Sequence, residues 1–263
     1  STRPDYINKE ILEVLVKYNV KTIELGIQSM TQSTLDLNNR GHNVDCVYEA
    51  SSLIKEYGIN LGLQMMVGLY GDTFETVLNT AFKLSKINPD FVRVYPTLTI
   101  KDTELERLYY MKKYIPMSLE DSIYLCKYVY ILFEYYNIPI IRLGLQSSDN
   151  ISEDGDVVAG PYHPAFRELV ESSIYKDFIE YYMNILNIKN DLIIECNNSE
   201  VSKIVGNKKL NLKYFKEKYN MNIKTKTHIL DKNILKLNGN IIYMNDFVNY
   251  IFEKDILRRV NET

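Results

Sequence analysis

Polar side chains and glycines gather in four short segments of the first third of the chain. These segments are Ser1–Asp5, Glu24–Ser29, Arg40–His42 and Gln64–Thr73. An arginine such as Arg40 can hold a carboxylate through two parallel hydrogen bonds, which a lysine cannot do. A glutamine such as Gln28 offers a donor and an acceptor, and a glycine such as Gly68 lets the backbone approach a ligand closely. Together they suit a ligand that carries a carboxylate and further polar groups.

Each of these residues also has a simpler explanation. Arg40 would be a surface arginine that pairs with Asp36, and His42 would make a structural hydrogen bond. The others would serve only strand ends and turns: Gln28, Gln64, Gly68 and Gly71.

The three cysteines, Cys46, Cys126 and Cys196, are scattered along the chain. An odd, dispersed set argues against a disulfide framework and for a reducing compartment. A metal site needs several soft ligands brought together, and the sequence has no local cluster of them. We therefore predict no metal ligands here.

Strands that alternate with helices position the four segments. Strands are expected at 22–28, 61–67, 91–98 and 140–146, and helices at 9–18, 45–57, 72–86 and 118–136. The pattern Asp72-x-x-Glu75 predicts a capping box at the start of the third helix. Such an alternation is typical of βαβ units with a parallel sheet, whose ligands bind at the carboxyl ends of the strands. Gln28, Gly68 and Pro96 fall at these ends. The sequence thus predicts an α/β fold, a partial (β/α) barrel.

The chain changes character near Asn187. We expect the partial barrel and its extension over residues 1–187, with an ordered turn at 157–164, and a small basic α+β domain over 188–263. Residues 201–236 contain ten lysines and only two acidic residues, Glu217 and Asp231. A concentration of positive charge of this kind can mark a nucleic-acid-binding part of a protein.

With Tyr95–Thr97 and Thr103–Leu105, the four segments resemble the radical S-adenosylmethionine superfamily. The most similar group is the catalytic subunit of the elongator complex. The resemblance runs from Ser1 to about Ser172 and implies that S-adenosylmethionine binds here. It carries cofactor binding over to these residues: Ser1, Arg3, Gln28, Arg40, Gln64 and Gly68. Relatives carry acidic residues at the positions of Ser1 and Gln64, so both contacts would be neutral here.

Two departures from that family's pattern affect the expected chemistry. Tyr70 stands in Gly68-Leu69-Tyr70-Gly71 where the family usually has a proline. The Cys-x3-Cys-x2-Cys loop that holds a [4Fe–4S] cluster in the family is absent from the printed sequence and belongs upstream of Ser1. Without those thiolates no electron reaches the sulfonium. We therefore expect a fragment that is inactive by itself, whose complete protein has the cluster and an electron donor.

Two later segments are candidates for contact with the substrate or with RNA. The stretch 159–172 also resembles the elongator group. His163 and Arg167 would face the substrate there. The alternative is that this stretch is only the start of a helix stabilised by a salt bridge. Residues 192–226 predict strand, helix, tight loop, helix and strand, similar to a KH-type RNA module. Its loop residues Gly206, Lys208 and Lys209, with Lys213, would meet phosphates. Lys209 replaces the second glycine of the KH loop, and a solvated lysine face is the alternative.

The resulting function hypothesis is a fragment of a radical S-adenosylmethionine enzyme. In the complete protein it would generate a 5′-deoxyadenosyl radical, with transfer RNA as the expected partner and wobble-uridine modification as the implied reaction. The alternative is a non-catalytic RNA-binding or scaffold protein on a degenerate barrel. The sequence shows neither a membrane span nor a leader, so we expect the cytoplasm.

Overall fold

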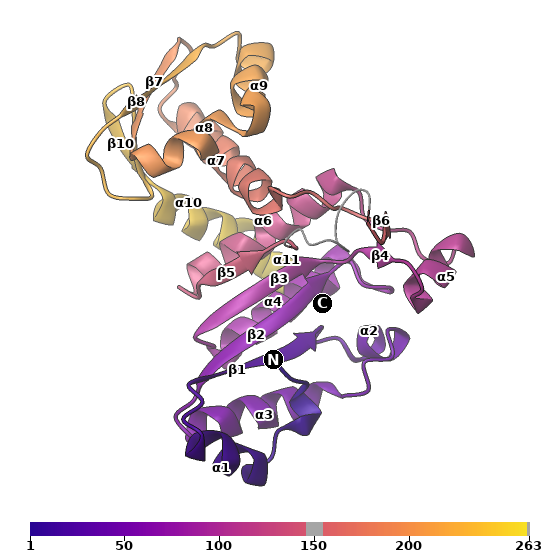
Figure 1. The fold of residues 1–263 in the computed structure, drawn as a ribbon. Helices are drawn as coiled ribbons and strands as arrows, with labels where there is room; N and C mark the ends of the chain where they lie inside the picture. Colours follow the sequence, from indigo (N-terminus) through magenta and orange to yellow (C-terminus); the bar gives the residue numbers. More distant parts are fainter. Residues whose placement is uncertain (146–154, 262–263) are drawn as a thin grey trace. The chain divides into compact units, whose positions relative to one another are not determined.

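The structure is a computed structural model that describes residues 1–145 and 155–261. The chain forms two compact units, drawn in Figure 1. The first comprises Ser1–Pro164 and the residues from Asp255 onward, and the second comprises Ala165–Lys254. Within the described residues, no helix has the length and apolar character needed to cross a membrane.

A parallel sheet forms the centre of the first unit. Its strands lie in the order β1 (Thr22–Gln28), β2 (Asn60–Val67), β3 (Phe91–Pro96) and β5 (Ile140–Leu143). Thr2 extends it past β1, because its amide donates to the Glu24 carbonyl at 2.9 Å and its carbonyl accepts from the Gly26 amide at 2.9 Å. This sheet confirms the predicted α/β class, a partial barrel with a smaller C-terminal part. Gln146, the expected end of the last strand, lies outside the described residues.

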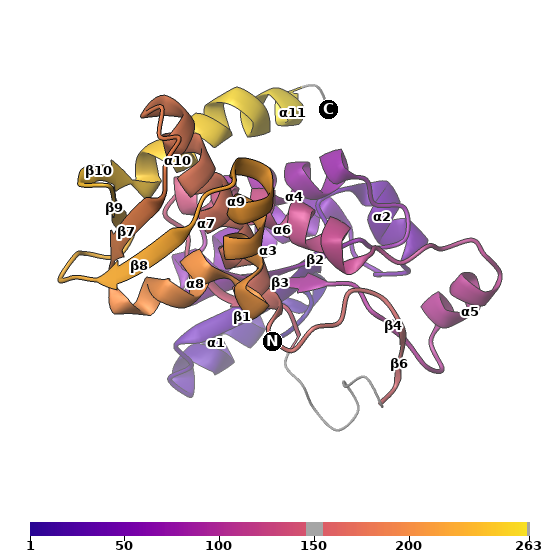
Figure 2. The same ribbon diagram turned by 90° about the horizontal axis from the view of Figure 1, so that it is seen from above.

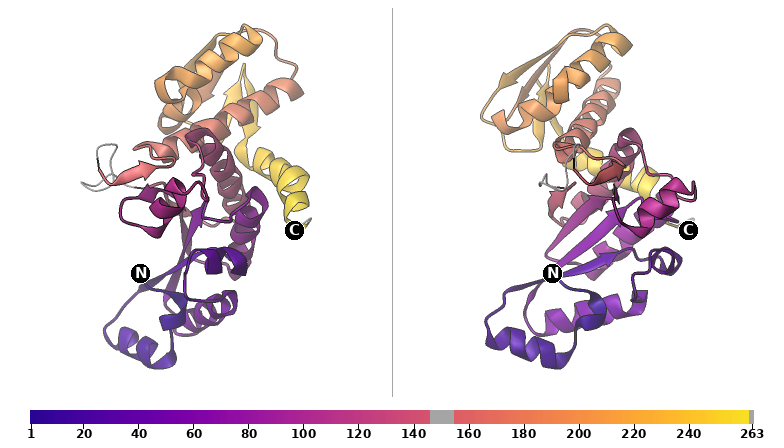
Figure 3. Two further views of the ribbon diagram at one scale, coloured as in Figure 1. Left: turned by 90° about the vertical axis from the view of Figure 1, so that its right-hand side faces the viewer. Right: turned by 45° about the vertical axis from the view of Figure 1, so that its right-hand side comes forward.

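The two faces of the sheet differ in polarity. In β2, the residues Leu61, Leu63 and Met65 are fully buried. Helices pack on β2, with α4 and α6 lying on the same side of the sheet (Figure 3). Gln64 alternates with these residues and therefore belongs to the opposite face. That second face is the interior of the partial barrel.

The helices of the first unit begin mostly at polar caps. They are α1 (Lys9–Lys17), α2 (Gln32–Leu37), α3 (Val44–Glu56), α4 (Phe74–Ile87), α5 (Glu104–Tyr110), α6 (Leu119–Tyr135) and α11 (Leu257–Asn261), preceded by a 3-10 turn at Pro4–Tyr6. The predicted capping box at Asp72 and Glu75 is wrong by one residue. Thr73 is the N-cap, and its hydroxyl accepts from the Thr76 amide at 3.2 Å while the Thr76 hydroxyl accepts from the Thr73 amide at 2.8 Å.

An excursion follows β3 before the sheet resumes. It contains β4 (Thr99–Ile100), which pairs antiparallel with β6 (Val157–Ala159), and it carries α5 (Figure 2). The stretch 157–164, expected as an ordered turn, thus begins with a short strand. A two-residue pairing partner that lies far away in the sequence leaves no local signal.

The second unit is an α+β unit. It contains α7 (Phe166–Ile185), β7 (Leu192–Cys196), α8 (Val201–Val205), α9 (Leu210–Tyr219), β8 (Ile223–Thr227), β9 (Ile234–Leu237), β10 (Asn240–Tyr243) and α10 (Met244–Ile251), with short 3-10 helices at Asn198–Glu200 and Asn207–Lys209 and a π-helical turn at Phe252–Ile256. The sheet order is β10-β9-β7-β8. The expected boundary near Asn187 falls after α7, whereas the packing groups α7 with the second unit and returns the chain to the first unit at Asp255.

Candidate functional site

The ends of β1 and β2 bring two of the predicted glutamines onto one face. Gly26 lies opposite Gln64 in the register of the two strands. A Cβ atom built on Gly26 would lie only 2.9 Å from Nε2 of Gln28, so the Gln28 side chain lies over Gly26. Because paired residues of neighbouring strands point to the same side, Gln28 and Gln64 share the interior face. Gln28 also has a φ of 69°, and the strand register shifts at this point.

The Arg40–His42 loop is tied to the same end of β1. Nε2 of His42 lies 3.2 Å from the Ile27 carbonyl. Arg3 donates from Nη2 to the Gly41 carbonyl at 3.1 Å and from Nε to Asp5 Oδ1 at 2.9 Å. This hydrogen bond from Arg3 holds the pKa of Asp5 below its usual value. Arg3 therefore holds the loop and is already occupied, whereas Ser1 is exposed beside it.

Arg40 is not the paired surface arginine of the simpler explanation. Asp36 accepts a hydrogen bond from Gln32 at 2.8 Å instead, and no ion pair to Arg40 exists among residues 1–145 and 155–261. Burial, followed by the nearby charge of Arg3, lowers the pKa of Arg40. An arginine that is partly buried beside a second cation is poised for an anion.

Three polar atoms around the end of β1 are buried and make no hydrogen bond. They are Oε1 of Gln28, Nε of Arg40 and Nδ1 of His42. Gln28 and His42 are 3% and 7% exposed, so the protein shields them almost completely. Leaving such an atom without a partner costs about 1–3 kcal/mol. A ligand with matching donors and acceptors would remove that cost.

The third strand contributes polar groups that the sequence reasoning missed. Arg93 of β3 reaches across the interior face to Glu24 of β1, with Nη2 and Oε1 2.8 Å apart. Just beyond β3, the hydroxyls of Thr97 and Thr99 are buried and make no hydrogen bond. Thr97 belongs to the segment Tyr95–Thr97 that carries the resemblance, but no local pattern marks Arg93 or Thr99, because only the folded sheet shows that they lie close to this face.

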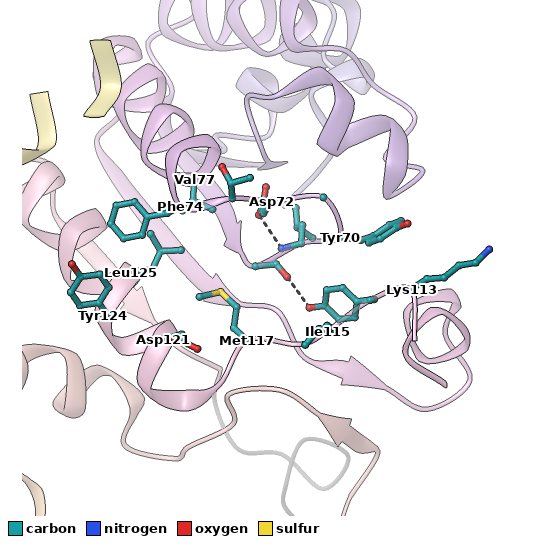
Figure 4. A pocket seen from close by; sticks show the side chains of 15 residues that line it. Tyr70, Asp72, Phe74, Val77, Lys113, Ile115, Met117, Asp121, Tyr124 and Leu125 are labelled. Atoms are coloured by element: carbon teal, nitrogen blue, oxygen red, sulfur yellow. Dashed lines mark hydrogen bonds between the residues drawn. The ribbon is translucent and has the colours of Figure 1, made fainter. Parts of the chain in front are cut away.

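A cavity of about 440 Å³ adjoins the carboxyl end of β2 (Figure 4). Its upper wall is the loop 68–74 and its lower wall is the segment 113–125. Gly68 has a φ of 82°, and a Cβ there would lie 2.7 Å from Sδ of Met117. The simpler explanation of Gly68 as a turn residue is therefore supported by its backbone and its crowding. This position also lines the cavity.

Asp72 holds the upper wall of the cavity together. Its Oδ2 accepts from the Leu69 amide at 2.9 Å, and its Oδ1 accepts from the hydroxyls of Thr34 at 3.3 Å and Thr76 at 3.4 Å. Burial raises the pKa of Asp72 to about 6, and these hydrogen bonds oppose the rise. Asp72 thus titrates near neutral pH while it supports the loop.

The predicted RNA loop of the second unit has an unusual backbone. Gly206, Lys208 and Lys209 have φ values of 76°, 48° and 62°. Lys208, Lys209 and Lys213 are exposed, and none of them forms an ion pair in the part of the chain that the structure describes. The strand–helix–loop–helix–strand order expected over residues 192–226 is present.

The two residues expected to face a substrate after β6 belong to different units. His163 belongs to the first unit, and Arg167 belongs to the second. Nε of Arg167 donates to Oε1 of Glu171 at 2.9 Å, four residues along α7. This contact agrees with the alternative of a salt-bridged helix start.

The cysteines do not form a metal site. Cys46, Cys126 and Cys196 are free thiols, and no cluster of three or more His, Cys, Asp or Glu side chains suited to a metal occurs in the described residues. Burial raises the pKa of Cys196 to about 11. Such thiols are protonated at neutral pH and are poor metal ligands.

Comparison with known proteins connects this geometry to a family. The Radical SAM superfamily profile matches residues 1–84, and the Radical SAM C-terminal domain matches residues 89–176. An uncharacterised protein of Methanocaldococcus jannaschii is 34% identical over 128 residues, which are 47% of this chain and 39% of that protein. The tRNA uridine(34) acetyltransferase of the same organism is 30% identical over 130 residues, which are 48% of this chain and 24% of that protein.

Eukaryotic relatives and a solved structure agree with these matches. Elongator complex protein 3 of Schizosaccharomyces pombe is 33% identical over 130 residues, which are 46% of this chain and 24% of that protein. The structure of archaeal Elp3 from Methanocaldococcus infernus aligns with a TM-score of 0.56 and 25% identity over 71% of this chain and 41% of that one. The matches thus span well under half of each relative. The chain belongs to the radical SAM superfamily, through the superfamily domain at residues 1–84 and its C-terminal domain at residues 89–176.

Proposed function

We propose that the first unit binds S-adenosylmethionine at the carboxyl edge of its sheet, as part of a protein that modifies transfer RNA. The observation that carries the proposal is the group of buried polar atoms without partners around β1, on Gln28, Arg40 and His42. A partly buried cation without a counter-ion is unfavourable, so the position of Arg40 in the loop tied to the end of β1 favours a bound anion.

The residue types match the cofactor part by part. Arg40 would hold the carboxylate through its two-pronged guanidinium. The Gln28 and Gln64 amides would meet the ammonium group or the ribose hydroxyls, with Gly68 allowing close approach of the backbone. Arg3 is engaged by Asp5 and Gly41, so its role is to position the Arg40 loop. Ser1 would add one neutral contact at the edge.

When an iron–sulfur cluster reduces it, S-adenosylmethionine supplies a 5′-deoxyadenosyl radical that abstracts hydrogen from a substrate. The three cysteines of this sequence do not fit a [4Fe–4S] cluster, because they are dispersed over both units and two of them are fully buried. Radical generation therefore depends on cluster ligands and an electron donor beyond these residues. The chain's own residues bind and orient the cofactor.

Transfer RNA is the partner that the relatives favour. Two of them are named as a tRNA uridine(34) acetyltransferase and as Elongator complex protein 3. The exposed Lys208, Lys209 and Lys213 of the KH-like loop would neutralise phosphates of such an RNA. The free thiols suit a reducing compartment such as the cytoplasm.

Calorimetric titration with S-adenosylmethionine and with its decarboxylated analogue tests the proposal. We expect the wild-type chain to bind the cofactor about 10- to 150-fold more tightly than the analogue, the equivalent of about 1.5–3 kcal/mol for a charged hydrogen bond. Arg40→Met should remove that preference. If neither compound binds while RNA does, the chain is instead the RNA-binding scaffold.

A further inference from the structure

The segment 109–117, which begins at the last residues of α5 and leads toward α6, combines exposed apolar side chains with positive charge. Its sequence is Tyr-Tyr-Met-Lys-Lys-Tyr-Ile-Pro-Met. Tyr110, Met111 and Ile115 are 68%, 48% and 85% exposed. Lys112 and Lys113 stand between them and are also exposed. Large apolar side chains left in water next to cations are typical of a binding surface.

The two lysines have no counter-ions of their own. Neither Lys112 nor Lys113 forms an ion pair with any residue that the structure describes. The acidic Glu104 of the same excursion is already paired with Arg107. The charge of the two lysines is therefore available to an anionic partner.

A tyrosine pair joins this segment to the cavity of the first unit. Tyr114 is 5% exposed, and its hydroxyl donates to the Gly68 carbonyl at 2.8 Å. The Tyr70 ring meets it edge-on, with centroids 6.2 Å apart and planes at 88°. Figure 4 shows Tyr70 and Lys113 at the same end of the cavity. Tyr114 is thus fixed, whereas Tyr70 is only half-buried.

The other aromatic residues of the cavity differ from Tyr70 in what they pack against. Phe74 and Tyr124 pack with Tyr128, and the Arg259 guanidinium lies 4.9 Å from the Phe74 ring centre. These contacts anchor α11. Among the described residues, Tyr70 makes one aromatic contact, the edge-on contact with Tyr114, and it stands where the family usually has a proline. A half-buried aromatic ring next to lysines without ion pairs is a combination that can bind single-stranded nucleic acid.

We infer that Tyr70 stacks on a base of a single-stranded RNA loop while Lys112 and Lys113 neutralise the adjoining phosphates. The choice of RNA as the partner rests on the proposed function. The site does not involve Gln28, Arg40 or the lysine loop of the second unit, so it would be a second and separate RNA contact. Two other partners would use part of this site: a free nucleoside would stack on the Tyr70 ring, and an acidic protein surface would pair with the two lysines.

Fluorescence anisotropy of the whole chain with a labelled anticodon stem–loop tests this inference. Tyr70→Ala should weaken binding about 5- to 150-fold, the range for loss of one base–aromatic stack, and Tyr70→Phe should restore most of it. Lys113→Gln should reduce the slope of log affinity against log salt by about 0.7. Tyr18→Ala and Lys17→Gln change a tyrosine and a lysine at the carboxyl end of α1, away from this segment, and should have no effect.

Several outcomes would overturn the inference. These are unchanged affinity in a folded Tyr70→Ala variant, equal binding of a duplex without a loop, or equal displacement of the RNA by polyglutamate. If uridine alone competes at the concentration at which the loop binds, the site takes free nucleosides instead of RNA. Tyr70→Ala should still bind S-adenosylmethionine like the wild type. A wild-type chain that binds the RNA loop but not the cofactor refutes the proposed function alone.

Discussion

Replacing Arg40 by methionine should stabilise the unliganded protein while it weakens cofactor binding. Nε of Arg40 is buried without a hydrogen bond, and the nearby Arg3 charge adds repulsion. An unsatisfied buried donor costs about 1–3 kcal/mol. Methionine preserves the length and packing of the apolar stem and removes both the donor and the charge. We expect a net gain of about 1 kcal/mol in the free energy of unfolding, or about 2–4 °C in melting temperature for a unit of this size.

The assay is a pair of measurements on the same preparations. Thermal melting without ligand gives the change in stability, and calorimetric titration gives the affinity for S-adenosylmethionine, expected to fall about 10- to 150-fold. Arg107→Met is the matched control, because Arg107 is exposed and forms an ion pair with Glu104 on α5. It should change stability by less than about 1 kcal/mol and leave the affinity intact. A destabilised Arg40→Met variant with normal affinity would refute the reasoning, since a structural arginine behaves in that way.

Three further changes test other parts of the account. Gly26→Ala places a Cβ 2.9 Å from Gln28 Nε2, so this change should displace the Gln28 side chain. Calorimetric titration should then show weaker cofactor binding, with little change in melting temperature. Unchanged binding would mean that Gln28 lies outside the site. Burial raises the pKa of Asp72 from 3.8 to about 6, so its contribution to stability is present below pH 4 and is lost as pH rises through 6. Thermal melts from pH 4 to 7 should therefore show a flatter dependence of melting temperature on pH for Asp72→Asn than for the wild type. An identical dependence would contradict the burial argument. Lys209 has a φ of 62°, a left-handed backbone conformation that glycine adopts without strain. Lys209→Gly should therefore raise the unfolding free energy of the second unit by about 1 kcal/mol in denaturant titrations. A decrease would mean that the lysine side chain itself supports the loop.

The sequence predicted the regular elements well because their signals are local. The strand expected at 22–28 is β1, and the two helices expected within residues 192–226 are α8 and α9. Alternation of apolar residues and polar caps decides such elements within a few turns of chain. The pairing of β4 with β6 depends on residues more than fifty positions apart, so no local pattern predicts it.

The sequence singles out candidate site residues, but it does not show how they are buried or hydrogen-bonded. Gln28, Gln64 and Arg40 stood out by type and position, yet nothing in the sequence shows that Arg40 is unpaired or that Gln28 has a left-handed backbone. The sequence leaves open an ion pair between Arg40 and Asp36, whereas in the structure Asp36 accepts a hydrogen bond from Gln32. Burial and hydrogen-bond satisfaction depend on the whole fold, so they become visible only in the structure.

Photochemical cross-linking of S-adenosylmethionine to the intact chain, followed by mapping of the labelled peptides, tests the binding site most directly. The account predicts that the label appears on peptides that contain residues 22–30, 38–42 or 60–68, and that excess unlabelled cofactor prevents it. A label confined to the second unit, or one that excess cofactor does not reduce, would contradict it.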